Sequence, residues 1–368
     1  MIMEQELLIN ADEAYSEILT QIRLAQESIH ICMYIWRDDK IGNLIAQELL
    51  EAADRGVDIK IIKDKAGSVF ERIELEKQSF FHKQKDLSSI IKEKILSFLY
   101  YRENDYPNDQ LINQKLNKLL EHKNIEIDFK EERHDHSKYF IFDNRILILG
   151  GMNIGDKSGS QQKYRDYMIK LCSQELVSYF FNRLAGQPPC DEREIEFYFN
   201  KRESDLYEIK PKVLELLEAA EDRVDIEMAY FGDCDITDKI IETCQRGVKV
   251  TIITSRDSNV QPDLNKCVLR KLIKKTGRKL TIYLSEQLIH SKFICIDNQT
   301  FFLGSANLHK LGMAQLSELN VLVNNSSKIC HKLKQWRHDH LNESFLISKE
   351  EDLDYNKLSI NGIGSEES

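Results

Sequence analysis

Short apolar runs and longer amphipathic stretches alternate along this chain, and the alternation occurs twice. Apolar residues at helical spacing predict helices, and compact runs rich in β-branched residues predict buried strands. The predicted order of helix, strand, helix and strand is 11–25, 29–35, 42–53 and 58–63 in the first half, and 213–220, 224–230, 236–244 and 249–254 in the second. Strands that alternate with helices indicate mostly parallel sheets covered by helices. The pattern therefore predicts an α/β fold of two tandem, pseudo-symmetric units.

A set of polar and glycine residues repeats together with these elements. Five positions of the first half recur 154 positions later, from 136 to 290 and onward in register. The pairs are His136 and His290, Lys138 and Lys292, Asp143 and Asp297, Gly150 and Gly304, and Asn153 and Asn307. A single histidine on a strand is usually a structural residue, but five markers repeated in register favour a functional role.

The spacing of the repeat predicts a site that binds an anion. The runs 139–142 and 293–296 have the composition of buried strands. Residues two apart on a strand point to the same side, so each histidine is expected beside the lysine that follows it. Gly150 and Gly151, like Gly304 and Ser305, follow a second apolar run and permit a turn that returns the asparagine to the pair. Two imidazoles, two ammonium groups and two amides at the interface of the halves suit a phosphodiester.

This duplicated H-x-K-x4-D-x6-G-[GS]-x-N pattern resembles the phospholipase D superfamily. The segments 52–57, 150–156 and 164–166 are similar to its bacterial branch of cardiolipin-synthase-like phosphatidyltransferases. The resemblance covers roughly residues 12–340. It implies two phospholipase D-like domains with the active site between them. It also implies phospholipase D or cardiolipin-synthase-like activity on phospholipids through a covalent phosphohistidine.

Chemistry and resemblance together predict the role of each repeated residue. One neutral imidazole attacks phosphorus while a protonated one donates to the leaving oxygen; the resemblance implies that His136 is the nucleophile and His290 the acid and then the base. Lys138 and Lys292 are expected to hold the non-bridging oxygens, with Asn153 and Asn307 as further donors. By analogy with the family, Asp166 and Glu318 each accept a hydrogen bond from an imidazole. Asp143 and Asp297 fall on the opposite strand face and are expected to be structural, as are Gly150, Gly151, Gly304 and Ser305.

The chemistry predicted for this site needs no metal and no cofactor. The stretches 134–136 and 338–340 both read His-Asp-His, which suggests metal ligation. However, no cysteine or carboxylate framework accompanies them, and His136 already has a predicted role. The eight cysteines form no C-x-x-C pair, which is typical of reduced thiols in a cytosolic protein. We therefore expect metal-independent catalysis.

Composition and length predict the domain organisation. The expected units are a first domain (1–186) with a helical insertion at about 66–133, a connector (187–211), a second domain (212–349) and an acidic tail (350–368). The insertion carries an apolar stripe with nearby lysines, which indicates either a helix packed on the domain or a helix at a membrane surface. The stripe consists of Leu87, Ile90, Ile91, Ile95, Phe98 and Leu99.

Charge and hydropathy bear on the substrate class. The net charge of −10 disfavours non-specific binding to polyanions, so a phospholipid is expected as substrate, with water or an alcohol as acceptor. The alternative is a nuclease of the same superfamily, and a non-catalytic scaffold is a third class. No signal peptide or membrane-spanning run is seen, which predicts a cytoplasmic protein with peripheral membrane contact. The run 307–312 departs from the Asn-Leu-Asp-x-Arg-Ser run of the branch, which leaves the acceptor alcohol and cardiolipin synthesis open. No oligomeric state follows from the sequence.

Overall fold

The computed structural model describes residues 4–73, 79–82, 114–155, 164–190, 193–258, 262–347, 349 and 352–354. The described elements of the first half are β1 (Glu4–Ile9), α1 (Asn10–Leu24), β2 (Ser28–Met33), α2 (Lys40–Asp54), β3 (Asp58–Lys63), α3 (Gly67–Ile73), α5 (Gln114–Glu121), β4 (Ile125–Asp128), β5 (Tyr139–Phe142), β6 (Ile146–Gly150), β7 (Tyr167–Cys172) and α6 (Gln174–Leu184). Those of the second half are β8 (Ile195–Lys201), β9 (Leu206–Tyr207), α7 (Ile209–Ala219), β10 (Arg223–Met228), α8 (Cys234–Gln245), β11 (Lys249–Ser255), α9 (Pro262–Thr276), β12 (Leu280–Ser285), β13 (Lys292–Ile296), β14 (Thr300–Gly304), α10 (Lys310–Ala314), β15 (Glu318–Asn324), α11 (Ser327–Leu341) and β16 (Ser344–Ile347).

Each half contains one mixed sheet. The first has seven strands in the order β1-β7-β6-β5-β2-β3-β4, and the second has nine in the order β16-β12-β11-β10-β13-β14-β15-β8-β9. Tandem α/β units are confirmed, but the sheets are not mostly parallel. Among the described strands, parallel pairing joins β2 with β3, β3 with β4, β10 with β11 and β11 with β12. The strands after each motif histidine are linked by short turns, which cannot make the crossover that a parallel pair needs.

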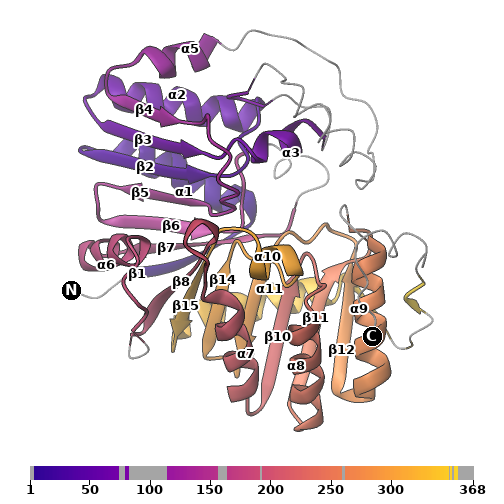
Figure 1. The fold of residues 1–368 in the computed structure, drawn as a ribbon. Helices are drawn as coiled ribbons and strands as arrows, with labels where there is room; N and C mark the ends of the chain where they lie inside the picture. The colour runs from indigo at the N-terminus through magenta and orange to yellow at the C-terminus, as the bar shows by residue number, and fades with distance from the viewer. Residues whose placement is uncertain are drawn as a thin grey trace.

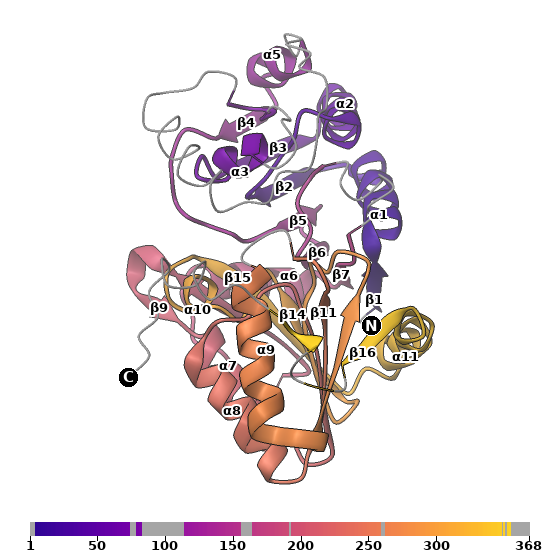
Figure 2. The same ribbon diagram turned by 90° about the vertical axis from the view of Figure 1, so that its right-hand side faces the viewer.

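The two halves meet through the inner faces of their sheets, where α6 and α11 also pack, and further helices cover the outer face of each sheet (Figures 1 and 2). A first apolar cluster lies between the first sheet and α1 and α2, and a second lies between the second sheet and α7, α8 and α9. A third joins the sheets, for example through Leu147 and Leu149 on β6 and Phe301 and Leu303 on β14. Such burial, at about 25 cal/mol per Å² of apolar surface, holds the halves in one fixed relation.

The repeated pattern extends to the helix ends. Asp39 and Asp233 cap α2 and α8 by accepting a backbone N–H of the first turn. Both helices then end two residues before a glycine in the left-handed region, Gly56 at φ 98° and Gly247 at φ 103°. Only glycine adopts this conformation without strain, so the chain turns sharply into β3 and β11. The chain therefore enters the equivalent strands β3 and β11 through the same kind of turn.

The predicted connector contributes to a sheet. Strand β8 pairs with β15 and occupies the place that β1 has beside β7 in the first half. Of the expected insertion, the described parts include α3, α5 and β4, while the apolar stripe from Leu87 to Leu99 lies outside the described residues. The acidic tail also lies outside them apart from residues 352–354. The domain boundaries stay a prediction.

Candidate active site

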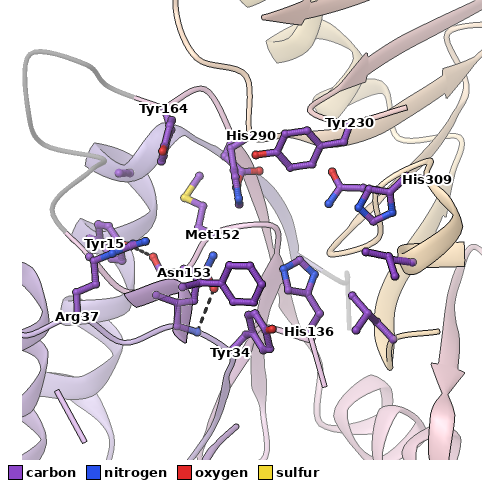
Figure 3. Close-up of a pocket in the computed structure, with 18 residues that line it drawn as sticks. Tyr15, Tyr34, Arg37, His136, Met152, Asn153, Tyr164, Tyr230, His290 and His309 are labelled. Atoms are coloured by element: carbon purple, nitrogen blue, oxygen red, sulfur yellow. Dashed lines mark hydrogen bonds and ion pairs between the residues drawn. The ribbon is translucent and has the colours of Figure 1, made fainter. Parts of the chain in front are cut away.

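Both motif histidines lie immediately before a strand that crosses the middle of its sheet. His136 precedes β5 and His290 precedes β13, and both imidazoles line one cavity of about 160 Å³ between the halves (Figure 3). Asn153, Asn307 and Asp166 line the same cavity. The structure therefore brings the duplicated histidines and asparagines of both halves to a single site.

Backbone bridges between the halves fix both histidines. The His136 N–H donates to the Ser317 carbonyl at 2.7 Å, and the His290 N–H donates to the Arg165 carbonyl at 2.8 Å. The guanidinium of Arg165 also crosses to the other half, where it lies 2.7 Å from the carboxylate of Glu227 on β10, and both side chains are buried. A buried pair of this kind is costly to break, because either partner alone would be an uncompensated charge. The two motifs are thus held at the interface by the main chain and by buried charge.

Each imidazole contacts a carboxylate that belongs to the other half. His136 Nδ1 lies 3.1 Å from Glu318 Oε2, and His290 Nδ1 lies 2.7 Å from Asp166 Oδ2. His136 Nδ1 also lies 3.2 Å from the carbonyl oxygen of Ser305. Because a carboxylate and a carbonyl only accept, the hydrogen of the neutral His136 ring belongs on Nδ1. That tautomer leaves a lone pair on Nε2, the atom a nucleophilic histidine uses.

The residues after β6 and β14 explain how the two carboxylates fit. Residue 151 has no room for a side chain, because a Cβ there would lie 2.5 Å from Asp166 Oδ1. Glycine therefore clears the space for the shorter carboxylate. In the other half Ser305 accepts the Leu319 N–H at 3.0 Å and donates its hydroxyl to Glu318. Gly150 and Gly304 permit close approach of β7 and β15 rather than a turn with positive φ.

The two lysines lie beneath the histidines. Lys138 and Lys292 are almost fully buried, and each Nζ donates to the backbone carbonyl of the histidine two residues before it. Lys292 Nζ is also 3.1 Å from His290 Nδ1. The Lys138 ammonium lies 5.5 Å from the centre of the Tyr34 ring, within range of a cation–π interaction. The expected pairing of each lysine with its own histidine is therefore present.

Burial and neighbouring charges change the protonation of the site. Burial, together with Lys138 and Lys292, lowers the pKa of His136 to about 4 although Glu318 acts in the opposite direction. Burial lowers the pKa of Lys138 to about 7, against the effect of Glu318. Burial raises the pKa of Asp166 to about 7, whereas the pKa of Glu318 lies below its usual value because His136, Lys138 and Ser305 outweigh the cost of burial. Near neutral pH, His136 is therefore an uncharged base.

The two asparagines differ in their contacts. Asn153 Oδ1 accepts the Ile35 N–H at 3.2 Å, and the Asn153 carbonyl accepts the Tyr15 hydroxyl. Asn307 is 4% exposed, and no described residue forms a hydrogen bond with its Oδ1. An unpaired buried amide oxygen is costly in a folded protein, so this atom is suited to a ligand.

The motif aspartates lie at the far end of their strands. Asp143 accepts the backbone N–H groups of Gln26, Glu27 and Ser28, at distances down to 2.8 Å. Asp297 accepts those of residues 221–223 in the same way. These bonds outweigh the cost of burial and lower the pKa of both carboxyls. Each aspartate thus ties a hairpin to the loop that precedes β2 or β10, remote from the cavity.

Sequence reasoning missed an aromatic lining around the imidazoles. Tyr34 contacts His136 edge-on with ring centres 4.8 Å apart, and Tyr164 stacks on His290 at 5.5 Å. Tyr230 lies parallel to His309, whose ring centre is 6.2 Å away. Tyr34 and Tyr230 follow the ends of β2 and β10, at the sheet edge where the motifs also lie. Their position after the ends of these strands is the sequence signal that could have identified the two tyrosines. They do not occupy equivalent positions of the two halves, so the repeat does not reveal them.

Two expectations from the sequence concern metal ligands and membrane-spanning helices. Within the described residues, no three histidine, cysteine, aspartate or glutamate side chains gather as a metal site would require. The side chains of residues 338 and 339, in the second His-Asp-His stretch, lie outside the described set. None of the helices in the part of the chain that the structure describes has the length and apolar character to cross a bilayer.

Comparison with known proteins gives a consistent result. The chain is 23% identical to the cardiolipin synthase of Listeria welshimeri over 380 residues, covering 94% of this chain and 70% of that protein. It is 23% identical to cardiolipin synthase B of Shigella flexneri over 343 residues, covering 86% and 76% respectively. The crystal structure of phosphatidylserine synthase from Haemophilus influenzae Rd KW20 superposes with a TM-score of 0.72 at 15% identity, over 98% of this chain and 92% of that one.

The family comparison covers both halves. The family described as "Cardiolipin synthase, PLD-like domain" matches residues 18–185 and again residues 213–340. These two matches contain both histidine motifs and both carboxylates that contact the imidazoles. The chain therefore belongs to this PLD-like family of the phospholipase D superfamily.

Proposed function

We propose that this protein is a phospholipid phosphatidyltransferase that works through a phosphohistidine on His136. One observation carries the proposal: two imidazoles face one cavity, and each is held by a carboxylate of the other half. Matched imidazoles of this kind provide a nucleophile and a proton donor for one displacement. The names of the relatives, cardiolipin synthases and a phosphatidylserine synthase, support a phospholipid substrate.

In the first step, the lone pair on His136 Nε2 forms a bond to phosphorus. The bond between phosphorus and the headgroup oxygen breaks, and that oxygen takes the proton from protonated His290. The headgroup leaves as an alcohol, and the phosphatidyl group stays on His136. The low pKa of His136 supports this role, because the ring is neutral at pH 7. Asp166, at 2.7 Å, stabilises the positive charge that His290 carries before the transfer.

In the second step, an acceptor hydroxyl replaces the headgroup. Its proton passes to His290, its oxygen bonds to phosphorus, and the bond between phosphorus and His136 breaks with its electrons returning to Nε2. Water as acceptor gives hydrolysis, as in a phospholipase D, and an alcohol gives transfer. Lys138 and Lys292 supply positive charge beneath the reacting phosphate, and the two asparagines supply amide donors.

The cavity wall supports a lipid rather than a nucleic acid. Apolar side chains of the first half line it beside the polar centre, namely Ala11, Ile35, Phe70 and Met152. Such a wall can accept the glycerol and first methylenes of a lipid, whereas a nucleic acid needs basic groups along its phosphates. Peripheral membrane contact and a cytoplasmic location are part of this proposal and rest on the sequence.

The decisive experiment offers the full-length protein vesicles of mixed phospholipids with an alcohol, and DNA and RNA in parallel, all in excess chelator. We expect release of headgroup and formation of the phosphatidyl alcohol. When the phospholipid is labelled at its phosphate and the reaction is quenched without acid, the label should be found on His136. Degradation of nucleic acid with no change in any phospholipid would replace the proposal with a nuclease. A need for added Zn²⁺ or Mg²⁺ would contradict metal-independent catalysis.

A further inference from the structure

His309 is a third histidine in the cavity, and its ring has a fixed orientation. Its Nδ1 accepts the backbone N–H of Gly312 at 2.9 Å and so caps the start of α10. It lies parallel to Tyr230, at an interplanar angle of 9°, on the wall formed by the second half (Figure 3). The equivalent position of the first half is Gly155, which has no side chain to offer.

The capping bond determines the tautomer of His309. A backbone N–H can only donate, so Nδ1 must keep its lone pair and the ring hydrogen must be on Nε2. Burial lowers the pKa of His309, which keeps the ring uncharged. No described residue forms a hydrogen bond with Nε2. His309 therefore presents the cavity with an N–H donor that cannot become an acceptor without losing the cap.

The place of this donor indicates which part of the substrate it meets. In a displacement, the leaving oxygen departs on the side of phosphorus opposite the nucleophile. If His136 attacks, the headgroup lies on the side of His290, and His309 lines the same cavity as both of these histidines. Asn307, two residues before His309, carries the amide oxygen for which no described partner exists. The second-half wall, which also includes Leu311 and Leu316, thus offers one hydrogen-bond donor and one acceptor to a bound substrate.

We propose that His309 is a specificity-determining residue, whose locked Nε2–H donates to a headgroup oxygen other than the one bonded to phosphorus. This inference rests on the proposed function. The reacting oxygen is already engaged by phosphorus and His290, so the group at His309 must be a neighbouring one. A hydroxyl can accept this bond. An ammonium cannot, because it has only hydrogens to offer and would face the N–H of the ring.

A competition between two small acceptors tests the proposal. Ethylene glycol and ethanolamine, at equal concentration, are offered to the full-length protein with phospholipid vesicles, and the two phosphatidyl products are quantified. The wild type should favour the glycol. His309→Asp keeps a side chain that can cap Gly312 but replaces the donor with a carboxylate, so the product ratio should shift toward ethanolamine by about tenfold or more.

His309→Asn is the matched control, because asparagine has the size of aspartate, also caps helices and retains an N–H donor. Its product ratio should stay on the side of the glycol. The ratio is read within each reaction, so a change in overall rate cancels. Equal ratios in the wild type and His309→Asp would overturn the inference while leaving the proposed function intact. Absence of any phosphatidyl product from the wild type would contradict the proposed function itself.

Discussion

In each half-site a carboxylate holds the motif histidine, but the two half-sites use different side chains. His290 is held by the short carboxylate of Asp166, which fits because residue 151 is glycine. His136 is held by the longer carboxylate of Glu318, which receives an additional hydroxyl bond from Ser305. The electrostatics differ accordingly, since the pKa of Asp166 is raised to about 7 and that of Glu318 is lowered.

This difference supports the separate roles proposed for the two equivalent histidines. Glu318 stays ionised near neutral pH and orients a neutral His136, which suits a nucleophile. Asp166 and His290 can share a proton at 2.7 Å, which suits a group that must hold a proton, give it away and take it back. Pseudo-symmetry in the backbone therefore coexists with asymmetry in proton handling, and several variants can test whether this reading is right.

Removing either imidazole should have the largest effect. His136→Ala and His290→Ala should each lower phospholipid turnover by at least ~10³-fold, since nucleophile and proton donor are both required. An activated aryl phosphodiester, whose leaving group needs no proton, should separate the two. With a diester labelled at its phosphate, His290→Ala should still release one equivalent of the aryl alcohol and keep the label bound to the protein. His136→Ala should do neither. The reverse result would exchange the two roles.

Alanine at the equivalent positions 151 and 305 should have unequal effects. Gly151→Ala places a Cβ against the Asp166 carboxylate and should misplace it, lowering kcat by ~10²-fold. Ser305→Ala removes the hydroxyl that donates to Glu318 and accepts the Leu319 N–H, but Glu318 keeps its contact with His136, so a loss of ~10-fold is expected. Steady-state rates on one soluble diester measure both. Equal losses would show that the two carboxylates are held alike.

The pH dependence of kcat/KM can show which half-site causes the loss of activity at alkaline pH. Burial lowers the pKa of Lys138 to about 7, so its charge is present below that pH and is lost as pH rises through it. We expect kcat/KM to fall above about pH 7. Arginine keeps its charge, so Lys138→Arg should move this limb upward by more than about one pH unit even if the rate is lower. If kcat/KM of Lys138→Arg falls at the same pH as that of the wild type, the fall is caused by Asp166 and His290 instead.

The smallest effect on activity should come from the motif aspartates, where the halves match most closely. Asp143→Asn and Asp297→Asn each weaken bonds to three backbone N–H groups and should lower the free energy of unfolding by about 1 kcal/mol. Denaturant titration measures this loss, and activity at saturating substrate should change by less than about twofold. A large and selective loss of activity in one variant would mean that this aspartate takes part in the chemistry.

The sequence predicted those features that repeat or that follow from local periodicity. The strand 139–142 agrees with β5, and 58–63 agrees with β3, because compact apolar runs between glycine and polar residues have few alternatives. Strand direction was predicted wrongly, since the pattern around Asp143 and Asn144 permits a hairpin that the alternation of strands and helices does not reveal.

The candidate site shows the same limit. The register identified His136, His290 and their lysines, and analogy identified Asp166 and Glu318. Neither the register nor the analogy predicted that each carboxylate contacts the histidine of the other half. Contacts between the halves do not affect the spacing of residues along the chain. Tyr34, Tyr164 and His309 were not selected for the same reason, since neither Tyr34 nor His309 has a counterpart of its type in the other half.

The crossed pairing of histidines and carboxylates has a consequence for descent. Two identical copies of one half, related by a twofold axis, would make the same reciprocal bonds, so an unfused ancestor could have had a complete site as a homodimer. In such a dimer every substitution appears in both half-sites at once. Fusion into one chain removes that coupling. Gly151 with Asp166, and Ser305 with Glu318, are the kind of divergence that becomes accessible only after the two copies are inherited as separate positions.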